Sequence, residues 1–274
     1  MNDTRKLPDL LKEQLETRYD ISLVPSENRS YYTPVTELLH EEGMTSFLNK
    51  YTVLIRGVDR TAAATFLAGW FGSVGLALQY AISVHETEPD FSLDNLFLDL
   101  VTKDNKTRLL FRPLRWSETA CPGGETQRLP WRAAAISGFY SGQARPLLES
   151  LSFVSGIPIG QLWGQWPTRF YREISGLISE ERNEQTKHRL LQDYQYLREG
   201  LEPSAIFGRA NNPFAVKIRQ VEPLSDPNRL TAIKSACCLN YRTEGSDFCY
   251  TCPRLSEEQR AVKREEYQCQ TGKG

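Results

Sequence analysis

The chain has 274 residues, which is enough for one large domain or for a body with a small added module. Apolar residues make up 40% of the sequence and charged residues 24%, and the formal net charge is −1. This balance excludes a strongly basic protein of the kind that binds nucleic acid, and there is no acidic tail. Residues 1–8 contain no apolar run, so we expect no signal peptide.

Helical patterns dominate the N-terminal part of the chain. Residues 4–18 carry a stripe of leucines at helical spacing. Thr33 and Pro34 are typical of a helix N-cap followed by proline at the first helical position. A long helix is predicted over residues 58–86, with Asp59 as its cap.

This predicted helix is long and apolar enough to cross a membrane, because residues 61–84 carry no charge over 24 positions. The hydrophobicity of the segment is lowered by Gly69, Gly72 and Gly75 and by several polar side chains. Glycines at three-residue spacing suit close packing of helices. We therefore predict a buried central helix rather than a transmembrane span.

The middle of the chain changes to strand patterns and then returns to helix. Residues 95–101 and 107–114 are short apolar runs joined by a polar turn at 103–106, which predicts a β-hairpin. Residues 117–130 are rich in glycine, proline and polar residues, so we expect an exposed loop. Further helices are expected over 131–141, over 144–154 after a break near Gly142, from Pro158 onward, and over 180–199 on the surface.

A boundary is predicted after this helical region. Prolines and turn residues punctuate 200–228, where residues 215–221 alternate like a strand. Ser256 to Gln259 form a capping box that opens a last helix. The expected fold is predominantly α-helical, of the α+β class, with a small antiparallel hairpin. We divide it into a helical body, residues 1–205, and a C-terminal cysteine-ligated module, residues 206–274.

Four of the six cysteines lie within sixteen residues of that module, in a C-C-x10-C-x2-C pattern. Thiols gathered on a short polar loop are suited to bind metal. The four are Cys237, Cys238, Cys249 and Cys252. Cys121 and Cys269 lie outside the pattern, and we assign them no role.

Three interpretations of the four cysteines are open. Burial in a core is disfavoured by the polar residues between them. A structural zinc site usually pairs two short knuckles, and only Cys249 with Cys252 makes one, since adjacent side chains such as Cys237 and Cys238 diverge. A [2Fe–2S] cluster is a wider object, and a proline after the last cysteine is typical of ferredoxin runs, so we favour the cluster.

The stretch Ala236-Cys-Cys-Leu-Asn-Tyr-Arg242, followed by Phe248-Cys-Tyr-Thr-Cys-Pro253, resembles the C-terminal signature of the FhuF-type ferric siderophore reductases. The close match covers about residues 229–256. The resemblance implies a [2Fe–2S] cluster bound by Cys237, Cys238, Cys249 and Cys252. It offers no equally sharp motif in the helical body.

The resemblance also implies an activity, namely one-electron reduction of a ferric siderophore in the cytoplasm with release of Fe(II). Hydroxamate and carboxylate oxygens hold Fe(III) far better than Fe(II), so one electron frees the metal. The sequence has no dinucleotide or phosphate-binding motif, so we expect an external electron donor, either a protein or a small reductant. Nucleic acid is not expected as a partner, while a peripheral association with an inner-membrane siderophore transporter is left open.

The helical body is the expected siderophore-binding part. An arginine and aromatic patch would suit an anionic chelate. The predicted patch flanks the loop at 117–130 and consists of Arg112, Arg115, Trp116, Trp131 and Arg132. The alternative is that these tryptophans belong to the core and the arginines to the solvated surface.

Two rival functions remain from the sequence. The cluster could serve a protein partner, as in a one-electron carrier or a sensor. The cysteines could also bind zinc and stabilise a binding protein that has no redox role.

Overall fold

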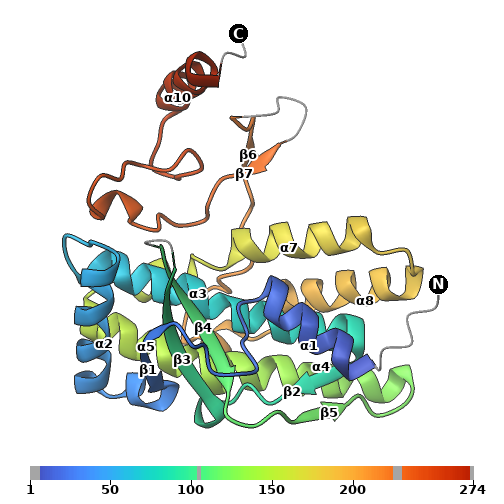
Figure 1. Cartoon of the computed structure of the whole chain (residues 1–274). Coiled ribbons are helices and arrows are strands. Elements are labelled where there is room, and N and C mark those ends of the chain that lie inside the picture. Colours follow the sequence, from blue (N-terminus) through green and yellow to red (C-terminus); the bar gives the residue numbers. More distant parts are fainter. Residues whose placement is uncertain (1–6, 104–105, 225–229, 272–274) are drawn as a thin grey trace.

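The computed structural model describes residues 7–103, 106–224 and 230–271 (Figure 1). Helices make up most of it, as predicted. The longer helices are α1 (Leu7–Arg18), α2 (Glu41–Leu54), α3 (Arg60–Tyr80), α4 (Glu125–Phe139), α5 (Arg145–Ser155), α7 (Pro167–Glu180), α8 (Glu184–Gln195) and α10 (Glu257–Thr271), and the short ones are α6 (Ile159–Trp163) and α9 (Pro203–Phe207).

An antiparallel sheet packs on this body, with strand order β1-β3-β4. The predicted hairpin is confirmed: β3 (Leu96–Lys103) pairs with β4 (Lys106–Pro113), while its turn at 104–105 lies outside the described residues. Strand β1 (Arg29–Pro34) was not predicted. Thr33 and Pro34 end this strand, so the predicted helix start there is wrong, and a 3-10 turn begins at Val35 instead.

Two further antiparallel pairs are short. One joins β2 (Thr87–Pro89) to β5 (Glu118–Ala120). The other joins β6 (Gln220–Val221) to β7 (Thr231–Ala232) in the C-terminal part. Only the end of the predicted strand 215–221 is therefore a strand.

Helix α3 is the buried centre of the body, as predicted. Its cap is confirmed, because the Asp59 side chain accepts a hydrogen bond of 3.0 Å from the Thr61 backbone N–H. Of the described residues, Arg60–His85 is long and apolar enough to cross a membrane, but 78% of its apolar window is buried inside the protein. Gly72 permits close packing, because a Cβ there would lie 3.2 Å from the Trp166 ring.

The segment that follows the sheet is more helical than predicted. Helix α4 begins at Glu125, so the expected loop at 117–130 is wrong beyond residue 124. The chain also continues through a wide π-helical turn at Tyr140–Ala144 into α5, without the predicted break near Gly142. Tertiary contacts explain the difference, since Arg128 and Arg132 in α4 pair with a buried carboxylate.

An aromatic cluster closes the core beside α3. Tyr140, Trp163 and Trp166 pack edge to face or tilted against one another and against Phe207 and Phe214. The last two residues lie beyond position 205. The division at 205/206 stays a prediction, and core contacts of the body extend past it.

The C-terminal segment stands above α3 and α7 (Figure 1). It contains the β6–β7 pair, the cysteine loop and α10. The predicted capping box is present at its last helix: Ser256 Oγ accepts from the Gln259 backbone N–H at 3.3 Å, and the Ser256 N–H donates to Gln259 Oε1 at 2.9 Å.

Candidate metal centre and adjoining cavity

Hydrogen bonds from two elements of the body hold the backbone of the adjacent cysteines. Thr65 Oγ1 in α3 donates to the Cys238 carbonyl oxygen at 2.6 Å. The side-chain amides of Gln161 and Gln165 each donate to the Cys237 carbonyl oxygen at 3.2 Å. The position of the cysteines is therefore set by the body as well as by their own loop.

Further contacts with the body fix the chain just before the cysteines. Thr168 Oγ1 in α7 lies 3.1 Å from the Ile233 carbonyl oxygen and accepts a 2.8 Å bond from the Ser235 backbone N–H. A Cβ added to Gly164 would lie 2.6 Å from the Ala236 Cβ. Glycine is required here because the loop approaches the backbone that precedes α7.

The chain bends sharply directly after the adjacent pair. Leu239 is buried and has a left-handed backbone with φ of 56°, which side chains other than glycine rarely adopt. The backbone N–H groups of Leu239 and Asn240 favour the thiolate forms of Cys237 and Cys238, and so act to lower their pKa values against the effect of burial.

The four sulfurs form two pairs. Cys252 Sγ lies 3.5 Å from Cys237 Sγ, while Cys238 and Cys249 lie in the wall of one cavity and each shifts the pKa of the other. The Cys237–Cys252 pair is buried, with exposures of 8% and 1%, while Cys238 and Cys249 are partly exposed. We call the first the inner pair and the second the outer pair.

This arrangement fits a centre with two metal ions. Among the residues that the structure describes, no three His, Cys, Asp or Glu side chains gather closely enough to bind one metal ion. A tetrahedral zinc ion would hold all four sulfurs at about 2.3 Å. Two separate thiol pairs suit a [2Fe–2S] group, in which each pair binds one iron. The donor set therefore fits that group.

Lys234 is the cation closest to the outer pair. Its Nζ lies 3.1 Å from Cys238 Sγ, and both Cys238 and Cys249 act to raise the pKa of this ammonium. The hydrogen bond from Cys249, together with the charge of Lys234, lowers the pKa of Cys238 to about 5. Burial instead raises the pKa of Cys237 in the inner pair to about 11. Of these two cysteines and Cys249, whose pKa is also raised, Cys238 therefore loses its proton most readily.

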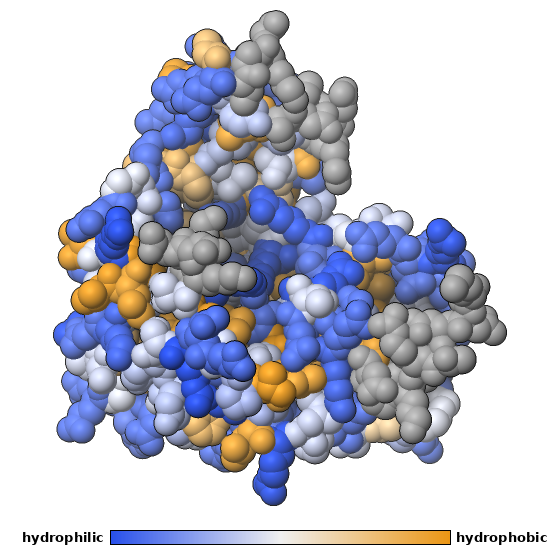
Figure 2. All heavy atoms as spheres, in the orientation of Figure 1, coloured by the Kyte–Doolittle hydropathy of each residue, from blue (hydrophilic) through white to orange (hydrophobic). Residues whose placement is uncertain are grey.

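A cavity of about 720 Å³ opens beside the outer pair. The surface is indented where the C-terminal segment meets the body, and hydrophilic side chains gather around the indentation (Figure 2). The volume lies within the range of small-molecule sites. Its wall includes both sulfur-bearing residues of the outer pair, Lys234, and Phe66 and Trp70 of α3.

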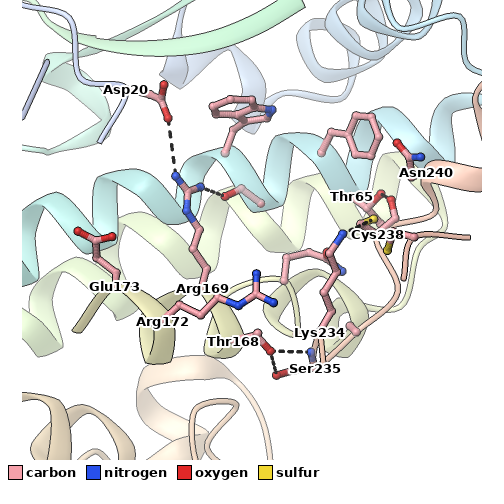
Figure 3. A pocket seen from close by; sticks show the side chains of 17 residues that line it. Asp20, Thr65, Thr168, Arg169, Arg172, Glu173, Lys234, Ser235, Cys238 and Asn240 are labelled. Atoms are coloured by element: carbon pink, nitrogen blue, oxygen red, sulfur yellow. Dashed lines mark hydrogen bonds and ion pairs between the residues drawn. The ribbon is translucent and has the colours of Figure 1, made fainter. Parts of the chain in front are cut away.

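Two arginines of α7 line the same cavity (Figure 3). Arg169 pairs with Asp20 at 3.7 Å and donates to the Gly69 carbonyl oxygen at 2.8 Å, which fixes its guanidinium. Arg172 donates to the Ala232 carbonyl oxygen at 2.5 Å and remains exposed to solvent. Arg172 thus links α7 to the C-terminal segment while presenting charge to the cavity.

None of the five residues predicted to bind substrate borders this cavity. Arg112 is buried in the sheet and pairs with Asp99 at 3.1 Å. Arg115 is exposed, and Trp116 is half-buried with the Lys12 ammonium 5.6 Å from its ring centre.

The other two predicted residues lie in α4. Trp131 packs against the core. Arg132 is buried and donates to Asp193 at 3.1 Å. Arg112 and Arg132 are buried and already have carboxylate partners, so neither lies on the solvated surface that the alternative assigned to the arginines, whereas Trp131 packs as that alternative expected.

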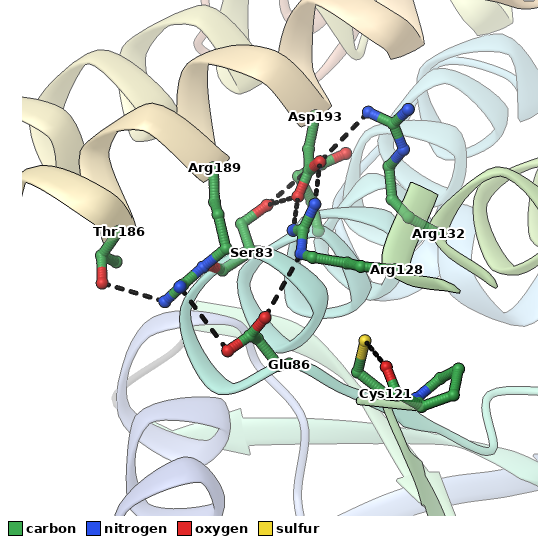
Figure 4. Close-up of polar contacts among 10 residues, drawn as sticks. Ser83, Glu86, Cys121, Arg128, Arg132, Thr186, Arg189 and Asp193 are labelled. Carbon is green, nitrogen blue, oxygen red and sulfur yellow. Dashed lines mark hydrogen bonds and ion pairs between the residues drawn. The ribbon is translucent and has the colours of Figure 1, made fainter. Parts of the chain in front are cut away.

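Asp193 is the centre of a buried polar network between α4, α8 and the π-helical turn Ala81–His85 that follows α3 (Figure 4). It accepts from Arg128 at 3.0 Å, from Arg132 at 3.1 Å and from Ser83 at 2.8 Å. Two guanidinium groups and a hydroxyl satisfy the buried carboxylate. Cys121 lies nearby on the surface, and burial with the charge of Glu86 raises its pKa, so it is not an activated thiol.

Sequence reasoning missed the cavity residues. Lys234 could have been found, because it lies in the cysteine loop three residues before Cys237. The sequence could not have indicated Phe66, Trp70 or Arg172 as cavity residues. No motif links α3 or α7 to the cysteine loop, which lies about 70 to 170 positions further along the chain.

Comparison with protein families supports the assignment of this segment. Residues 235–254 match the family model described as the FhuF 2Fe-2S C-terminal domain. The matched segment contains all four clustered cysteines, which confirms the resemblance predicted from their spacing. The match does not extend into the helical body. No curated protein matches the chain.

Proposed function

We propose that this protein reduces an Fe(III) siderophore of the hydroxamate or carboxylate type by one electron and so releases Fe(II). The observation that carries the proposal is the cavity whose wall contains Cys238 and Cys249. A small ferric chelate bound there would contact the outer face of the metal centre directly. The family match of residues 235–254 supports the same activity.

The four cysteines would hold a [2Fe–2S] group, which supplies one electron at a time. This matches the chemistry required, because gain of one electron turns the hard Fe(III) ion into Fe(II), which oxygen donors bind far less tightly. The chain needs no nucleophile and no general base for this reaction.

The cavity residues have distinct parts in binding. Phe66 and Trp70 offer apolar surface to the organic backbone of a chelate. Arg172 presents charge and N–H donors to carboxylate or hydroxamate oxygens. The Thr65, Gln161 and Gln165 side chains hold the cysteine loop against the body, so binding does not have to order it.

An external electron donor, a protein or a small reductant, would restore the reduced protein after each turnover. We extend the proposal to a cytoplasmic location, where imported ferric siderophores would arrive. Contact with an inner-membrane siderophore transporter would suit that route.

The experiment uses protein purified without oxygen, reduced by light, and mixed with ferric hydroxamate, carboxylate and catecholate chelates. The visible spectrum follows reoxidation of the protein while a ferrous chromophore captures the product. We expect one Fe(II) for each electron lost, and competition by the matching gallium(III) chelate, which binds but cannot be reduced. Failure of every ferric chelate to reoxidise the protein would leave an electron carrier or sensor as the remaining function.

A further inference from the structure

The two cysteine pairs differ in what surrounds them. The inner pair, Cys237 and Cys252, is buried, while both residues of the outer pair line the cavity. If each pair binds one iron, the two halves of the centre are not equivalent. One half faces the protein interior and the other faces the site proposed for the chelate.

Charge is distributed just as unevenly. Lys234 Nζ lies 3.1 Å from the Cys238 sulfur and its charge also acts on Cys249, and among the described residues its ammonium forms no ion pair with a carboxylate. The guanidinium of Arg172 acts electrostatically on Cys249 as well.

The inner pair has weaker cationic support. Arg260 donates to the Cys252 carbonyl oxygen at 2.7 Å rather than to its sulfur. Its charge is also offset by Glu257 at 3.5 Å. The positive potential is therefore greater at the outer pair.

We propose that Lys234 is a positioning residue that draws the transferred electron to the half of the centre held by Cys238 and Cys249. The added electron increases the negative charge of the half on which it resides, and a cation in contact with that half's ligands stabilises it. The electron then resides on the side of the centre nearest the cavity.

The electron balance is simple. One electron enters from the external donor and one leaves to the Fe(III) of the chelate, and no bond or proton on Lys234 changes. This inference deepens the proposed function and rests on its [2Fe–2S] group, but it does not depend on which chelate binds.

The test measures the midpoint potential of the full-length, metal-loaded protein by anaerobic titration with no chelate present. Lys234→Met keeps an unbranched side chain and removes the charge, so we expect a lower potential. A tenfold rise in the ratio of oxidised to reduced protein at fixed potential would correspond to a shift of about 59 mV for one electron.

Two variants serve as controls. Lys234→Arg keeps the charge and should restore a potential close to that of the parent. Lys187→Met removes a charge that pairs with Glu184 at 2.7 Å on α8, outside the cavity, and should leave the potential unchanged. An unchanged potential in Lys234→Met, or an equal shift in Lys187→Met, would overturn the proposal.

A second measurement uses the unmodified protein and so does not depend on variants that fold. Paramagnetic NMR of the reduced protein distinguishes the cysteine β-protons on the ferrous iron from those on the ferric iron. We expect the β-protons that show contacts to the Lys234 side chain to belong to the ferrous iron. Ferric behaviour of those protons would refute the inference even if chelate reduction were established, and ferrous behaviour would support it even if no chelate were reduced.

Discussion

The hydroxyl of Thr65, near the N-terminal end of the buried helix α3, donates a 2.6 Å hydrogen bond to the backbone carbonyl oxygen of Cys238. The two residues are 173 positions apart in the sequence. The bond joins the most buried helix of the body directly to the outer half of the candidate metal centre. The outer half of the candidate centre is therefore hydrogen-bonded directly to the body.

Replacing Thr65 tests this connection. Thr65→Val keeps the shape of the side chain and removes the donor, so the Cys238 carbonyl oxygen loses one bond, which costs about 1 kcal/mol. We expect faster loss of the visible spectrum when the loaded protein is challenged with an iron chelator. Thr65→Ser retains the donor and should behave like the parent. Equal rates for valine and serine would contradict a role for this bond.

The six cysteines should separate into two classes. Alanine at any of Cys237, Cys238, Cys249 or Cys252 should abolish the charge-transfer absorption and reduce bound iron and sulfide severely. Cys121→Ala and Cys269→Ala are the matched controls and should retain two irons and two sulfides per chain. Stoichiometric zinc and no colour in protein purified without oxygen would instead support the zinc alternative.

The buried network around Asp193 should contribute to the stability of the fold rather than to catalysis. Asp193→Ala leaves Arg132 buried without a carboxylate and Arg128 with only the partly exposed Glu86 at 3.4 Å, and breaking a buried pair in this way typically costs about 3–5 kcal/mol. Urea unfolding of the metal-loaded protein measures the loss. Glu184→Ala removes only the exposed partner of Lys187 and should cost less than about 1 kcal/mol. A small effect at Asp193 would show that the network is dispensable.

Substitutions of Arg172 and Arg115 test whether the chelate binds in the cavity or at the arginine and aromatic patch predicted from the sequence. Arg172→Gln should weaken binding of an anionic gallium(III) chelate by about tenfold, the loss expected for one charge-assisted hydrogen bond. Arg115→Gln removes an equally exposed charge outside the cavity and should leave the dissociation constant unchanged. Fluorescence or calorimetric titration measures both. The reverse result would restore the patch around residues 117–130 as the binding site.

Local signals in the sequence were sufficient to predict several parts of the fold. The Asp59 cap, the hairpin of β3 and β4, and the Ser256 capping box all depend on residues close in sequence. The cysteine spacing likewise predicted the resemblance that the family match of residues 235–254 confirms, because all four clustered cysteines lie on one loop.

Long-range pairing explains what the sequence did not predict. Strand β1 depends on β3, about 70 positions away, and helix α4 begins early where its arginines meet Asp193. The cavity has the same origin, because α3, α7 and the cysteine loop come together only in the fold. Arg112 and Arg132 were predicted to bind substrate from their charge, whereas their burial against Asp99 and Asp193 required the structure.

The most direct test of the central claim is to fill the cavity. Gly69 lies in its wall on α3, and a Cβ there meets only the Gln165 Cβ at 3.9 Å, so a side chain is tolerated. Leucine also favours the helix by close to 1 kcal/mol relative to glycine. Gly176→Leu, on α7 with no atom within 4 Å of an added Cβ, is the matched control outside the cavity.

The measurement is the rate at which a ferric chelate reoxidises each photoreduced variant, with Fe(II) captured in parallel. We predict that Gly69→Leu loses at least about 1.4 kcal/mol of chelate binding, a tenfold fall in rate at low chelate concentration, while its spectrum and its reduction by light stay unchanged. Gly176→Leu should react like the parent. Unaltered reoxidation of Gly69→Leu would show that the electron does not leave through this cavity.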